Sequence, residues 1–385
     1  MLKFKLLMDR RIFGFLGLLA VAFLVTTAIF FYAKGYRFNF KQKTIDGTGI
    51  IQIGSTPKGA AVYINDEASP RDATDVSLTN LKPGKYQIKL TKNGFIDWKK
   101  AVEVRAGLVT QIEALLFPSA PNLKAITFTG IMNPKLSPDN QKLVFAVDEP
   151  DKKGLWVLDL SDRPIFFSKE PKQIAKDTVN LSFSESTFEW TPDSKGVLVT
   201  VKIGAGKQNY QLNADQLNEN FTDITESLTS LKTQWSKDAE IKAKDRLNAF
   251  GDEFKKLTEG SKQLLYSPNE ERVLIVKDAE AIVYDLKPYL SFDKKPAQFT
   301  LPKADSYIWY PEFTQSGHDS RHLILIRKDS ISIIESDGKN EMTIYTGNFD
   351  PGSVFAWPNG SQLLIMTSLN SSTNKEANIY SLELR

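Results

Sequence analysis

The chain contains two histidines, and their spacing is the first feature that could support chemistry. His318 and His322 stand four positions apart with Asp319 between them, which is the i, i+4 spacing of a metal-binding pair on a helix. Here the pair leads from a turn-like stretch into the apolar run LILIR, so the spacing does not place both rings on one helical face. We therefore expect no metal site. A Ser-His-Asp triad has no base outside this short segment, and no Gly-x-Ser-x-Gly motif is present.

Two carboxylates could instead act as a pair. Glu189 and Glu312 lie beside apolar segments of the repeats described below, and a pair of carboxylates is the machinery of most glycoside hydrolases. Solvated or salt-bridged carboxylates are the ordinary alternative among 46 acidic residues, so we assign no catalytic residue. Gly204, Gly206 and Lys207 lack the spacing of a phosphate-binding loop and the Ser or Thr that follows it. They predict a hairpin turn, and no cofactor is expected.

Length and composition predict several folded units, and the net charge predicts no strongly charged partner. The 385 residues exceed the usual size of one domain, and 41% apolar with 25% charged residues is an ordinary globular balance. The formal net charge is only +3, so we expect no nucleic-acid partner. Cysteine is absent, which excludes disulfides, thiolate catalysis and cysteine-ligated zinc.

The N-terminal region carries a membrane-anchor signal. Ile12 to Ala33 is free of charge over 22 residues, which at about 1.5 Å per residue spans the roughly 30 Å hydrocarbon core of a bilayer. A cleavable signal peptide has a shorter apolar region, of about 7 to 15 residues, and then a small-x-small site. Phe31, Tyr32 and Ala33 do not fit such a site. We predict a leader at residues 1–11, an uncleaved transmembrane signal anchor at 12–33 and a polar linker at 34–48.

From residue 49 the hydrophobic pattern has a period of two, which is typical of half-buried strands. The alternating residues form five runs: Ile51 and Ile53, Val62 and Ile64, Tyr86 to Leu90, Val102 and Val104, and Ile112 to Leu116. Turn residues separate these runs, including Pro57 to Gly59, Lys82 to Gly84, and Asn93 with Gly94. The pattern predicts a small β-sandwich over residues 49–117.

The same residues resemble a known family. The run STPKGAAVYIN from Ser55 and the run LKPGKYQIKLTKNGFIDW from Leu81 are similar to the PEGA domain, whose Pro-Glu-Gly-Ala signature is met here as Pro-Lys-Gly-Ala. The resemblance implies a small β-sandwich found mostly in surface and envelope proteins of prokaryotes, and it implies no reaction. Tyr63, Tyr86 and Trp98 could form a sugar-stacking platform, but aromatic residues on alternating strand positions of so small a domain favour core packing.

Charge does not decide the orientation of the anchor. Four basic residues precede the apolar segment and four follow it closely, so the positive-inside rule is balanced. A leader this short is a poor candidate for translocation, and the next module resembles extracytoplasmic ones. We therefore predict a single-pass cell-membrane protein with a cytoplasmic leader and extracytoplasmic C-terminal domains.

Past residue 118 the chain repeats one plan five times: a turn, a hydrophobic strand and a returning strand. The turns are LSPDNQ at Leu136, TPDSKG at Thr191, SPNEER at Ser267, TQSGHDSR at Thr314 and WPNGSQ at Trp357. Proline presets φ and the following Asp or Asn bonds back to the backbone, which predicts tight turns between paired strands. Five copies in register predict blades of four strands each.

The repeats resemble the WD40-like propeller repeats of the TolB type. Ser137, Pro138 and Asp139, with Asp159 and Leu160, match that family's Ser-Pro-Asp turn and its later Asp-Leu pair, whereas the fourth and fifth copies lack the Pro-Asp pair. The resemblance implies a β-propeller, which we place at residues 121–385 with five blades, six being the alternative. It also implies roles in envelope complexes, without specifying a partner.

The fifth copy reaches the end of the chain before it has a fourth strand. Candidate fourth strands of other copies are Pro164 to Ser168, Ala297 to Leu301 and Met342 to Thr346. The segment AITFTG, from Ala125 to Gly130, precedes the first blade and resembles MTIYTG from Met342. We predict that it completes the last blade and so closes the ring.

One stretch breaks the strand pattern, at about residues 223–259. Its apolar residues recur near helical spacing: Leu228, Leu231, Trp235, Ile241, Leu247, Phe250, Phe254 and Leu257. Its charged residues form an i, i+4 face, so we predict a helical insertion between the second and third blades. Packing of the apolar stripe on the propeller is favoured over a partner-docking helix, because such a stripe in water needs a core.

The sequence thus predicts a mainly β protein with an N-terminal transmembrane helix, a small sandwich and a propeller. Because no catalytic motif is found, we expect no enzyme but a membrane-anchored extracytoplasmic binding or scaffold protein of a prokaryotic cell envelope. Its partners would be the membrane and, at the propeller face, an envelope protein or a glycan. The alternative is a propeller glycoside hydrolase that uses Glu189 and Glu312 as central carboxylates.

Overall fold

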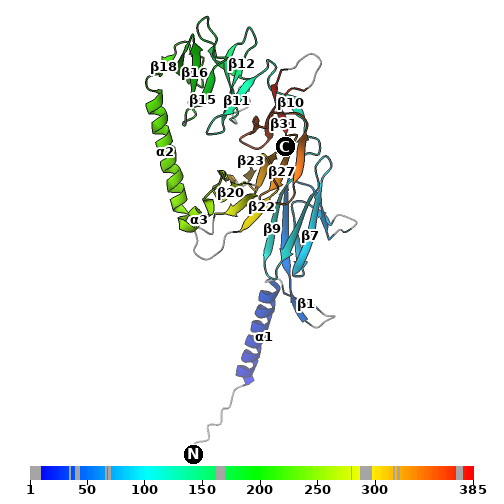
Figure 1. The fold of residues 1–385 in the computed structure, drawn as a ribbon. Helices are drawn as coiled ribbons and strands as arrows, with labels where there is room; N and C mark the ends of the chain where they lie inside the picture. The colour runs from blue at the N-terminus through cyan, green and yellow to red at the C-terminus, as the bar shows by residue number, and fades with distance from the viewer. Residues whose placement is uncertain are drawn as a thin grey trace, which may run out of the picture. The chain divides into compact units, whose positions relative to one another are not determined.

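The computed structural model describes residues 10–33, 36–39, 44–65, 67, 71–161, 170–278, 280–286, 297–314, 317–318, 321–369 and 376–385. The chain divides into two compact units, Met1–Phe117 and Pro118–Arg385. Both units are built mainly from antiparallel sheets, which confirms the mainly β fold (Figure 1). Residues 1–9 of the predicted leader lie outside the described residues.

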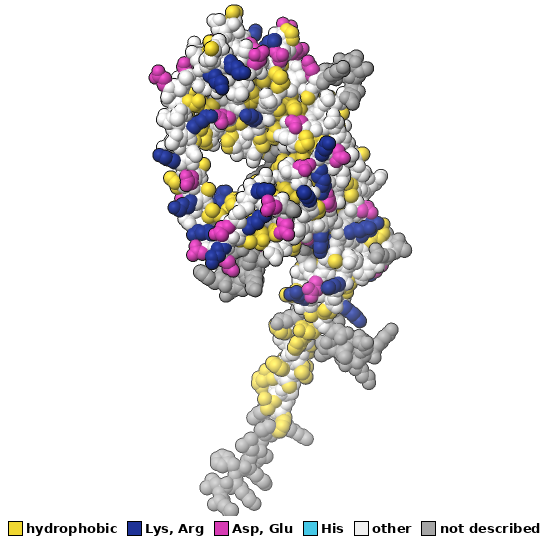
Figure 2. All heavy atoms as spheres, viewed as in Figure 1, with side chains coloured by type: hydrophobic (Ala, Val, Ile, Leu, Met, Phe, Trp, Pro, Cys, Tyr) yellow, Lys and Arg dark blue, Asp and Glu magenta, His cyan; other side chains and the backbone are white. Residues whose placement is uncertain are grey.

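The first unit begins with an apolar helix, α1 (Arg10–Ala33). Its stretch Phe13–Tyr32 has a mean hydropathy of 2.4 over 20 residues, and none of it is buried. Figure 2 shows hydrophobic side chains over its length. A helix satisfies its own backbone hydrogen bonds, which is what a membrane-spanning segment requires. The predicted anchor therefore has the length, polarity and backbone of a membrane span.

The predicted polar linker contains a hairpin. Strands β1 (Tyr36–Asn39) and β2 (Thr44–Gly47) pair in antiparallel register, with Tyr36 opposite Gly47. Tyr36, Phe38 and Ile45 are strand formers at alternating positions, and the surrounding lysines and glutamine hid this short pattern. The predicted polar linker thus contains two paired strands, although residues 34–35 and 40–43 lie outside the described range.

The predicted sandwich is present and has two sheets, in the orders β6-β3-β9 and β5-β4-β7-β8. Its strands are β3 (Gly49–Thr56), β4 (Ala61–Ile64), β5 (Asp72–Ala73), β6 (Val76–Leu81), β7 (Gly84–Thr91), β8 (Trp98–Val104) and β9 (Val109–Leu115). Strands β3 and β9 are parallel, and the other pairs are antiparallel. Alternating residues of both sheets, such as Ile53, Val62, Leu90 and Trp98, meet in one buried core.

The second unit contains five four-stranded antiparallel sheets, as the five-blade prediction requires. Blade 1 has β11 (Met132–Leu136), β12 (Lys142–Val147), β13 (Gly154–Asp159) and β14 (Lys172–Lys176). Blade 2 has β15 (Thr187–Trp190), β16 (Gly196–Ile203), β17 (Gly206–Asn213) and β18 (Thr222–Asp223). Blade 3 has β19 (Gln263–Tyr266), β20 (Arg272–Lys277), β21 (Glu280–Asp285) and β22 (Gln298–Leu301). Blade 4 has β23 (Ser306–Trp309), β26 (His322–Ile326), β27 (Ser330–Glu335) and β28 (Met342–Thr346).

Blade 5 is completed by a strand from the other end of the propeller. It consists of β29 (Val354–Ala356), β30 (Gln362–Thr367), β31 (Asn378–Glu383) and β10 (Leu123–Ala125). The pairing of β10 with β31 closes the last blade from the predicted side of the chain, but the paired strand shares only Ala125 with the predicted segment. Backbone bonds from Ile126 and Ile131 to β31 and the residue before it extend the contact. Of the other predicted outer strands, those near Ala297 and Met342 form β22 and β28, while residues 164–168 lie outside the described residues and β14 is the outer strand of blade 1.

Hydrophobic clusters between neighbouring blades hold the propeller together. One cluster joins blades 1 and 2, a second joins blades 5 and 1, and a third joins blades 3 and 4. Among the residues that the structure describes, these clusters include none that joins blade 2 to blade 3 or blade 4 to blade 5, but a hydrogen bond from Tyr310 to Gly360 links blades 4 and 5. We call the junction between blades 2 and 3 the seam.

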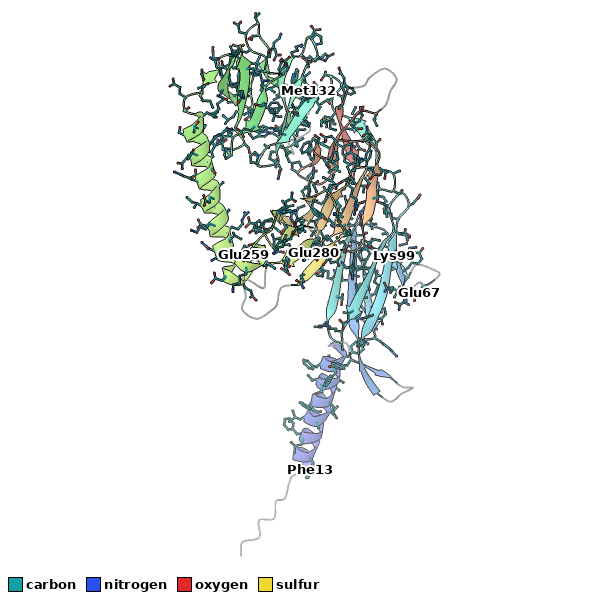
Figure 3. All side chains as sticks on the ribbon, viewed as in Figure 1. Phe13, Glu67, Lys99, Met132, Glu259 and Glu280 are labelled. Carbon is teal, nitrogen blue, oxygen red and sulfur yellow. The ribbon has the colours of Figure 1, made fainter. Side chains whose placement is uncertain are left out.

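Two helices occupy the seam: α2 (Leu228–Ala249) and α3 (Gly251–Thr258). Helix α3 buries Phe254 against the sheet of blade 3, beside Val273 and Ile275. Helix α2 has no buried residue. Figure 3 shows its side chains as sticks along the helix, down to α3 and the labelled Glu259. At about 1.5 Å per residue, α2 spans roughly 33 Å. The helical insertion is confirmed, but its apolar stripe packs on the propeller in α3 and is at most half-buried in α2.

Candidate functional site

In every blade the turn between the first and second strand, here called the blade turn, contains the same backbone hydrogen bond. The N–H of its first residue donates to the C=O of the first residue of the second strand: Ser137 to Lys142, Thr191 to Gly196, Ser267 to Arg272, Tyr310 to His322 and Trp357 to Gln362. Proline follows the first residue each time, and Asp, Asn or Glu follows the proline. This bond aligns the five repeats residue by residue.

The acidic or amide residue of the blade turn holds the turn closed in the first three blades. Asp139 Oδ1 accepts hydrogen bonds from Ser137 Oγ at 2.6 Å and from the N–H of Gln141 at 3.0 Å. Asp193 accepts the same two bonds in blade 2, and Asn269 does so in blade 3. The hydrogen bonds from Ser137 and Gln141 outweigh burial and lower the pKa of Asp139.

The fourth blade turn is where the structure corrects the sequence alignment. We predicted it at Thr314, but the backbone bond places it at Tyr310-Pro311-Glu312. Lys142 follows Ser137 by five positions, whereas His322 follows Tyr310 by twelve. The extra residues include a small hairpin, β24 (Phe313–Thr314) and β25 (Gly317–His318), and this insertion displaced the sequence pattern.

Glu312 and His322, which the sequence suggested for two different chemistries, meet in this turn. Glu312 Oε2 lies 3.0 Å from His322 Nδ1, and Arg321 Nη2 donates to Glu312 Oε1 at 3.2 Å. Both Glu312 and His322 are buried, at 4% and 2% exposure. Glu312 therefore occupies the place of Asp139 in its own turn, with His322 and Arg321 as its donors.

The electrostatics of this cluster favour the charged carboxylate. Burial alone would raise the pKa of Glu312, but the hydrogen bond from His322 and the charges of His322 and Arg321 outweigh it, so the pKa is lowered. Next to the cluster, burial raises the pKa of Tyr310 to about 12, so its phenol stays a proton donor. Tyr310 Oη donates to the carbonyl of Gly360 in the blade 5 turn, which ties blades 4 and 5 together.

Aromatic residues just before the blade turn link neighbouring blades. Trp190 Nε1 donates to the carbonyl of Lys135 in blade 1 at 2.8 Å, and Trp309 Nε1 donates to the carbonyl of Leu265 in blade 3 at 2.8 Å. Tyr266 has this position in blade 3. Its ring is covered by the guanidinium of Arg246, 4.5 Å from the ring centroid, and it stacks on Phe250. Helix residues thus take the place that a neighbouring blade has elsewhere.

Blade 2 consequently presents a polar face toward the seam. The register places Glu189, Leu198 and Gln211 side by side on this face, and Thr187, Thr200 and Asn209 beside them. The set of exposed or half-exposed polar residues, which we call the seam face, is Thr187, Glu189, Thr200, Lys202, Lys207, Asn209 and Gln211. The opposite face of the same sheet is apolar and packs on blade 1. Figure 2 shows the surface hollowed beside α2, between blades 2 and 3.

The candidate carboxylates of the hydrolase hypothesis are both engaged with cations. Glu189, on the seam face, forms an ion pair with Lys232 near the start of α2. Glu312 is held by His322 and Arg321 inside the blade 4 turn. A second ion pair, between Arg246 and Glu270, fixes the other end of α2 to the blade 3 turn. Both glutamates thus act as structural ion-pair partners in this structure.

The remaining residues singled out in the sequence have structural places. Gly204 and Gly206 form the β16–β17 hairpin turn. Trp98 is buried in the sandwich core, and Tyr86 packs against that core, so these two aromatic residues form no exposed platform. Within the described ranges, no three His, Asp or Glu side chains gather closely enough to hold a metal ion. His318 lies in β25, and Asp319 lies outside the described residues.

Comparison with known proteins identifies the first unit. Residues 48–119 match the PEGA domain. The chain carries a PEGA domain. The match covers the sandwich with its Pro-Lys-Gly-Ala turn and no part of the blades, so the resemblance seen in the sequence is confirmed for this unit. No curated protein matches the chain.

Solved structures similar to the chain include TolB proteins and a lyase. TolB from Acinetobacter baumannii is 12% identical with a TM-score of 0.22, covering 78% of this chain, which spans 61% of that protein's length. A putative TolB from Agrobacterium tumefaciens is 13% identical with a TM-score of 0.21, covering 64% of this chain and 70% of its own. Oligogalacturonate lyase from Vibrio parahaemolyticus is 9% identical with a TM-score of 0.27, covering 84% and 97%. All three TM-scores lie below 0.5.

The seam face is the part of the site that sequence reasoning missed. Its signal was present in part, because polar residues recur at every second position within β16 and β17, at Thr200 and Lys202 and at Lys207, Asn209 and Gln211, whereas β12 of blade 1 is apolar on both faces. A strand in the interior of a propeller is covered on both faces by neighbouring blades, so polar residues at every second position indicate an uncovered face.

Proposed function

We propose that this protein is a membrane-anchored binding and scaffold protein of a prokaryotic cell envelope, and that its propeller docks a glycan on the seam face. The observation that carries the proposal is the seam face itself, a polar sheet surface where a propeller ordinarily has an apolar contact between blades. The unburied apolar α1 and the PEGA domain support the anchored envelope location.

The chemistry of the seam face favours a hydroxyl-rich ligand. Thr187, Thr200, Asn209 and Gln211 offer hydroxyl and amide groups that both donate and accept hydrogen bonds. Thr200 donates to Asn209 Oδ1 at 2.7 Å, which orients the amide of Asn209 with its NH2 group as a donor. Leu198, the large apolar residue on this face, is buried at 4% exposure. Protein interfaces have an apolar core, which this face lacks, so we favour a glycan over a protein.

Binding of the purified full-length protein to a panel of envelope polysaccharides tests the docking site. Asn209→Ala and Gln211→Ala should each weaken binding about tenfold, the effect of losing roughly one ligand hydrogen bond. Gln298→Ala, an exposed position on the outer strand of blade 3, is the matched control and should bind like the wild type. Failure to bind any polysaccharide, or equal losses in all three variants, contradicts the glycan proposal. A photo-crosslinker at Gln211 that captures one discrete protein would replace the glycan with a protein partner.

Turnover on the same panel tests the hydrolase alternative. The ion pairs of Glu189 and Glu312 leave both carboxylates with structural partners, so we expect no hydrolysis by the wild type. Hydrolysis that is abolished in the double variant Glu189→Gln, Glu312→Gln, with the fold retained, would establish the enzyme instead.

Cysteine labelling tests the proposed orientation. The chain has no cysteine, so Val179→Cys introduces a unique thiol at a fully exposed residue of the propeller unit. A membrane-impermeant maleimide should label this variant in intact cells. Labelling only after lysis would place the propeller in the cytoplasm.

A further inference from the structure

The exposed apolar residues of the PEGA-domain unit gather at one end of the sandwich. Leu108 is 55% exposed and Val109 is 59% exposed, in the tip that connects β8 to β9. Among the side chains that the structure describes in residues 10–117, the other exposed large hydrophobic residue outside α1 is Tyr36. Contiguous exposed apolar surface rimmed by polar residues is a feature of protein and membrane interaction sites, so the surroundings of Leu108 and Val109 decide what these two residues do.

This tip lies beside the C-terminal end of α1. The N–H of Gly107 donates to the carbonyl of Thr48 at 2.9 Å, and the N–H of Ile50 donates to the carbonyl of Leu108 at 3.1 Å. A Cβ added to Gly47 would lie 2.7 Å from Ala106 Cβ and 3.5 Å from the ring of Tyr36. The ring of Tyr36 in turn meets the ring of Phe31 in α1, edge to face, with centroids 5.4 Å apart. A continuous set of contacts thus leads from α1 to the tip.

Basic residues surround the tip. The register pairs Gly49 with Leu81 and Gly84 with Val104, so the turn from β6 to β7 lies at the same end of the sandwich. This turn carries Lys82 and Lys85, both exposed, and Arg105 precedes the tip. Arg105 pairs with Glu103 at 3.1 Å, while the two lysines add positive charge. Apolar side chains ringed by basic ones are the composition that suits an anionic membrane surface.

We propose that Leu108 and Val109 insert into the interfacial layer of the bilayer that α1 crosses. The inference rests on the proposed function in one respect, namely that α1 spans a membrane. The tip then gives the PEGA domain a second contact with the lipid, and the domain is held against the headgroups instead of swinging freely on its anchor. The exit of α1 and the tip share one interface, because Tyr36 and Ala106 both lie against Gly47.

A fluorescent label on the full-length protein in lipid vesicles tests the insertion. Because the chain has no cysteine, Leu108→Cys and Val109→Cys each provide a unique site at an exposed residue for an environment-sensitive dye such as NBD. Asn93→Cys is the matched control: Asn93 is exposed in the turn after β7, at the opposite end of the sandwich. Seven residues of β8 separate the two ends, which at about 3.3 Å per residue is roughly 20 Å.

The vesicles contain phosphatidylcholine and phosphatidylglycerol, with and without a lipid that carries a shallow doxyl quencher. The labels at positions 108 and 109 should emit at shorter wavelength than the label at 93 and lose several-fold more intensity to the quencher. Equal emission and equal quenching at all three positions, in protein that floats with the vesicles, would overturn the insertion and leave the anchor intact. Protein that does not float, or that carbonate extracts without detergent, would overturn the anchor and the insertion together.

Discussion

The contact between Glu312 and His322 does in blade 4 what the bond between a hydroxyl and a carboxylate does in blades 1 and 2. In those blades, Ser137 and Thr191 bond to Asp139 and Asp193 within a short turn. In blade 4, Tyr310 stands where blades 1 and 2 have serine or threonine, and an inserted hairpin lengthens the turn. The longer side chain of Glu312 contacts Arg321 and His322, which follow the hairpin. The buried charge is therefore part of the fold of this blade.

Removal of the Glu312 charge should destabilise the propeller. Glu312→Gln removes the buried carboxylate that Arg321 and His322 contact, and breaking one side of a buried ion pair costs about 3–5 kcal/mol. Glu189→Gln is the control, because Glu189 pairs with Lys232 at a half-exposed site, where such pairs contribute up to about 1 kcal/mol. Urea unfolding of the two variants measures both effects. Equal, small losses in the two variants would contradict a structural role for the Glu312 pair.

The same pair predicts a dependence of stability on pH. The pKa of Glu312 is lowered from its ordinary value of 4.5, so the folded state binds this proton less tightly than the unfolded state does. The stabilisation is complete above the unfolded-state pKa and is lost as pH falls through the lower folded-state pKa. The gap in melting temperature between wild type and Glu312→Gln should therefore shrink as the pH falls below about 4.5. If this difference in melting temperature stays unchanged in acid, the carboxylate charge of Glu312 is not its cause.

At the level of single residues, sequence reasoning identified Glu312 and His322 but not their contact. The i, i+4 spacing suggested a partnership between His318 and His322, whereas the actual partner of His322 is Glu312, ten positions earlier. The insertion of β24 and β25 brings the two together, and a pairing across an inserted hairpin leaves no periodic signal in the sequence.

At the level of elements, the seam is held by two helices with different roles. Helix α3 covers the apolar sheet face of blade 3 with Phe254, which is fully buried. Helix α2 buries nothing and is fixed at its two ends by ion pairs, from Lys232 to Glu189 and from Arg246 to Glu270. Hydrophobic periodicity located both helices. It did not show that α3 packs on the sheet of blade 3 whereas α2 spans the distance from blade 2 to blade 3.

Two alanine substitutions in the helices should change the free energy of unfolding by very different amounts. Phe254→Ala empties a buried site between α3 and blade 3, and such a loss typically costs about 3–5 kcal/mol. Ile241→Ala alters a residue of α2 that is 57% exposed, so its effect should stay within about 0.5 kcal/mol. Chemical denaturation of each variant gives the comparison. A large loss for Ile241→Ala would mean that α2 packs against a surface after all.

For the whole molecule, closure depends on residues at both ends of the second unit. The hydroxyl of Thr127 donates to Asn378 Oδ1 at 3.0 Å and accepts the N–H of Ile379 at 2.9 Å, and both contacts are buried. Strand β10 adds its own ladder to β31. The repeat count predicted this closure from the sequence, because the last repeat lacked one strand and an unassigned segment preceded the first.

Deletion of residues 378–385 should lower the melting temperature of the entire propeller. The deletion removes β31, and β10 then has no strand to pair with. Blade 5 thus loses half of its sheet. Removal of Arg385 alone separates the effect of β31 from that of the terminal residue, which lies beyond β31 and places its guanidinium over the ring of Tyr310. Differential scanning fluorimetry reports the change. An unchanged midpoint in the longer deletion would show that the ring does not depend on the closing strand.

What the sequence could not provide at this scale is the interruption of the ring. Turn signals and strand counts treat each blade alike, and the five blade turns indeed share one backbone bond. The seam depends on which side chains pack between blades. Those contacts join residues that are far apart in the sequence. Only the polar alternation of β16 and β17 hints at it, and this alternation is meaningful once blades 1 and 2 are known to pack through the other face.

The position of β10 also gives the protein a mechanical property. This strand is the first element of the propeller after the PEGA domain, so any force passed along the chain from the first unit to the blades enters the propeller at Leu123. The force acts first on the three residue pairs that join β10 to β31. The buried hydrogen bonds that join Thr127 to Asn378 and Ile379 follow directly along the chain, so the last strand of the propeller carries such a force before the other blades do.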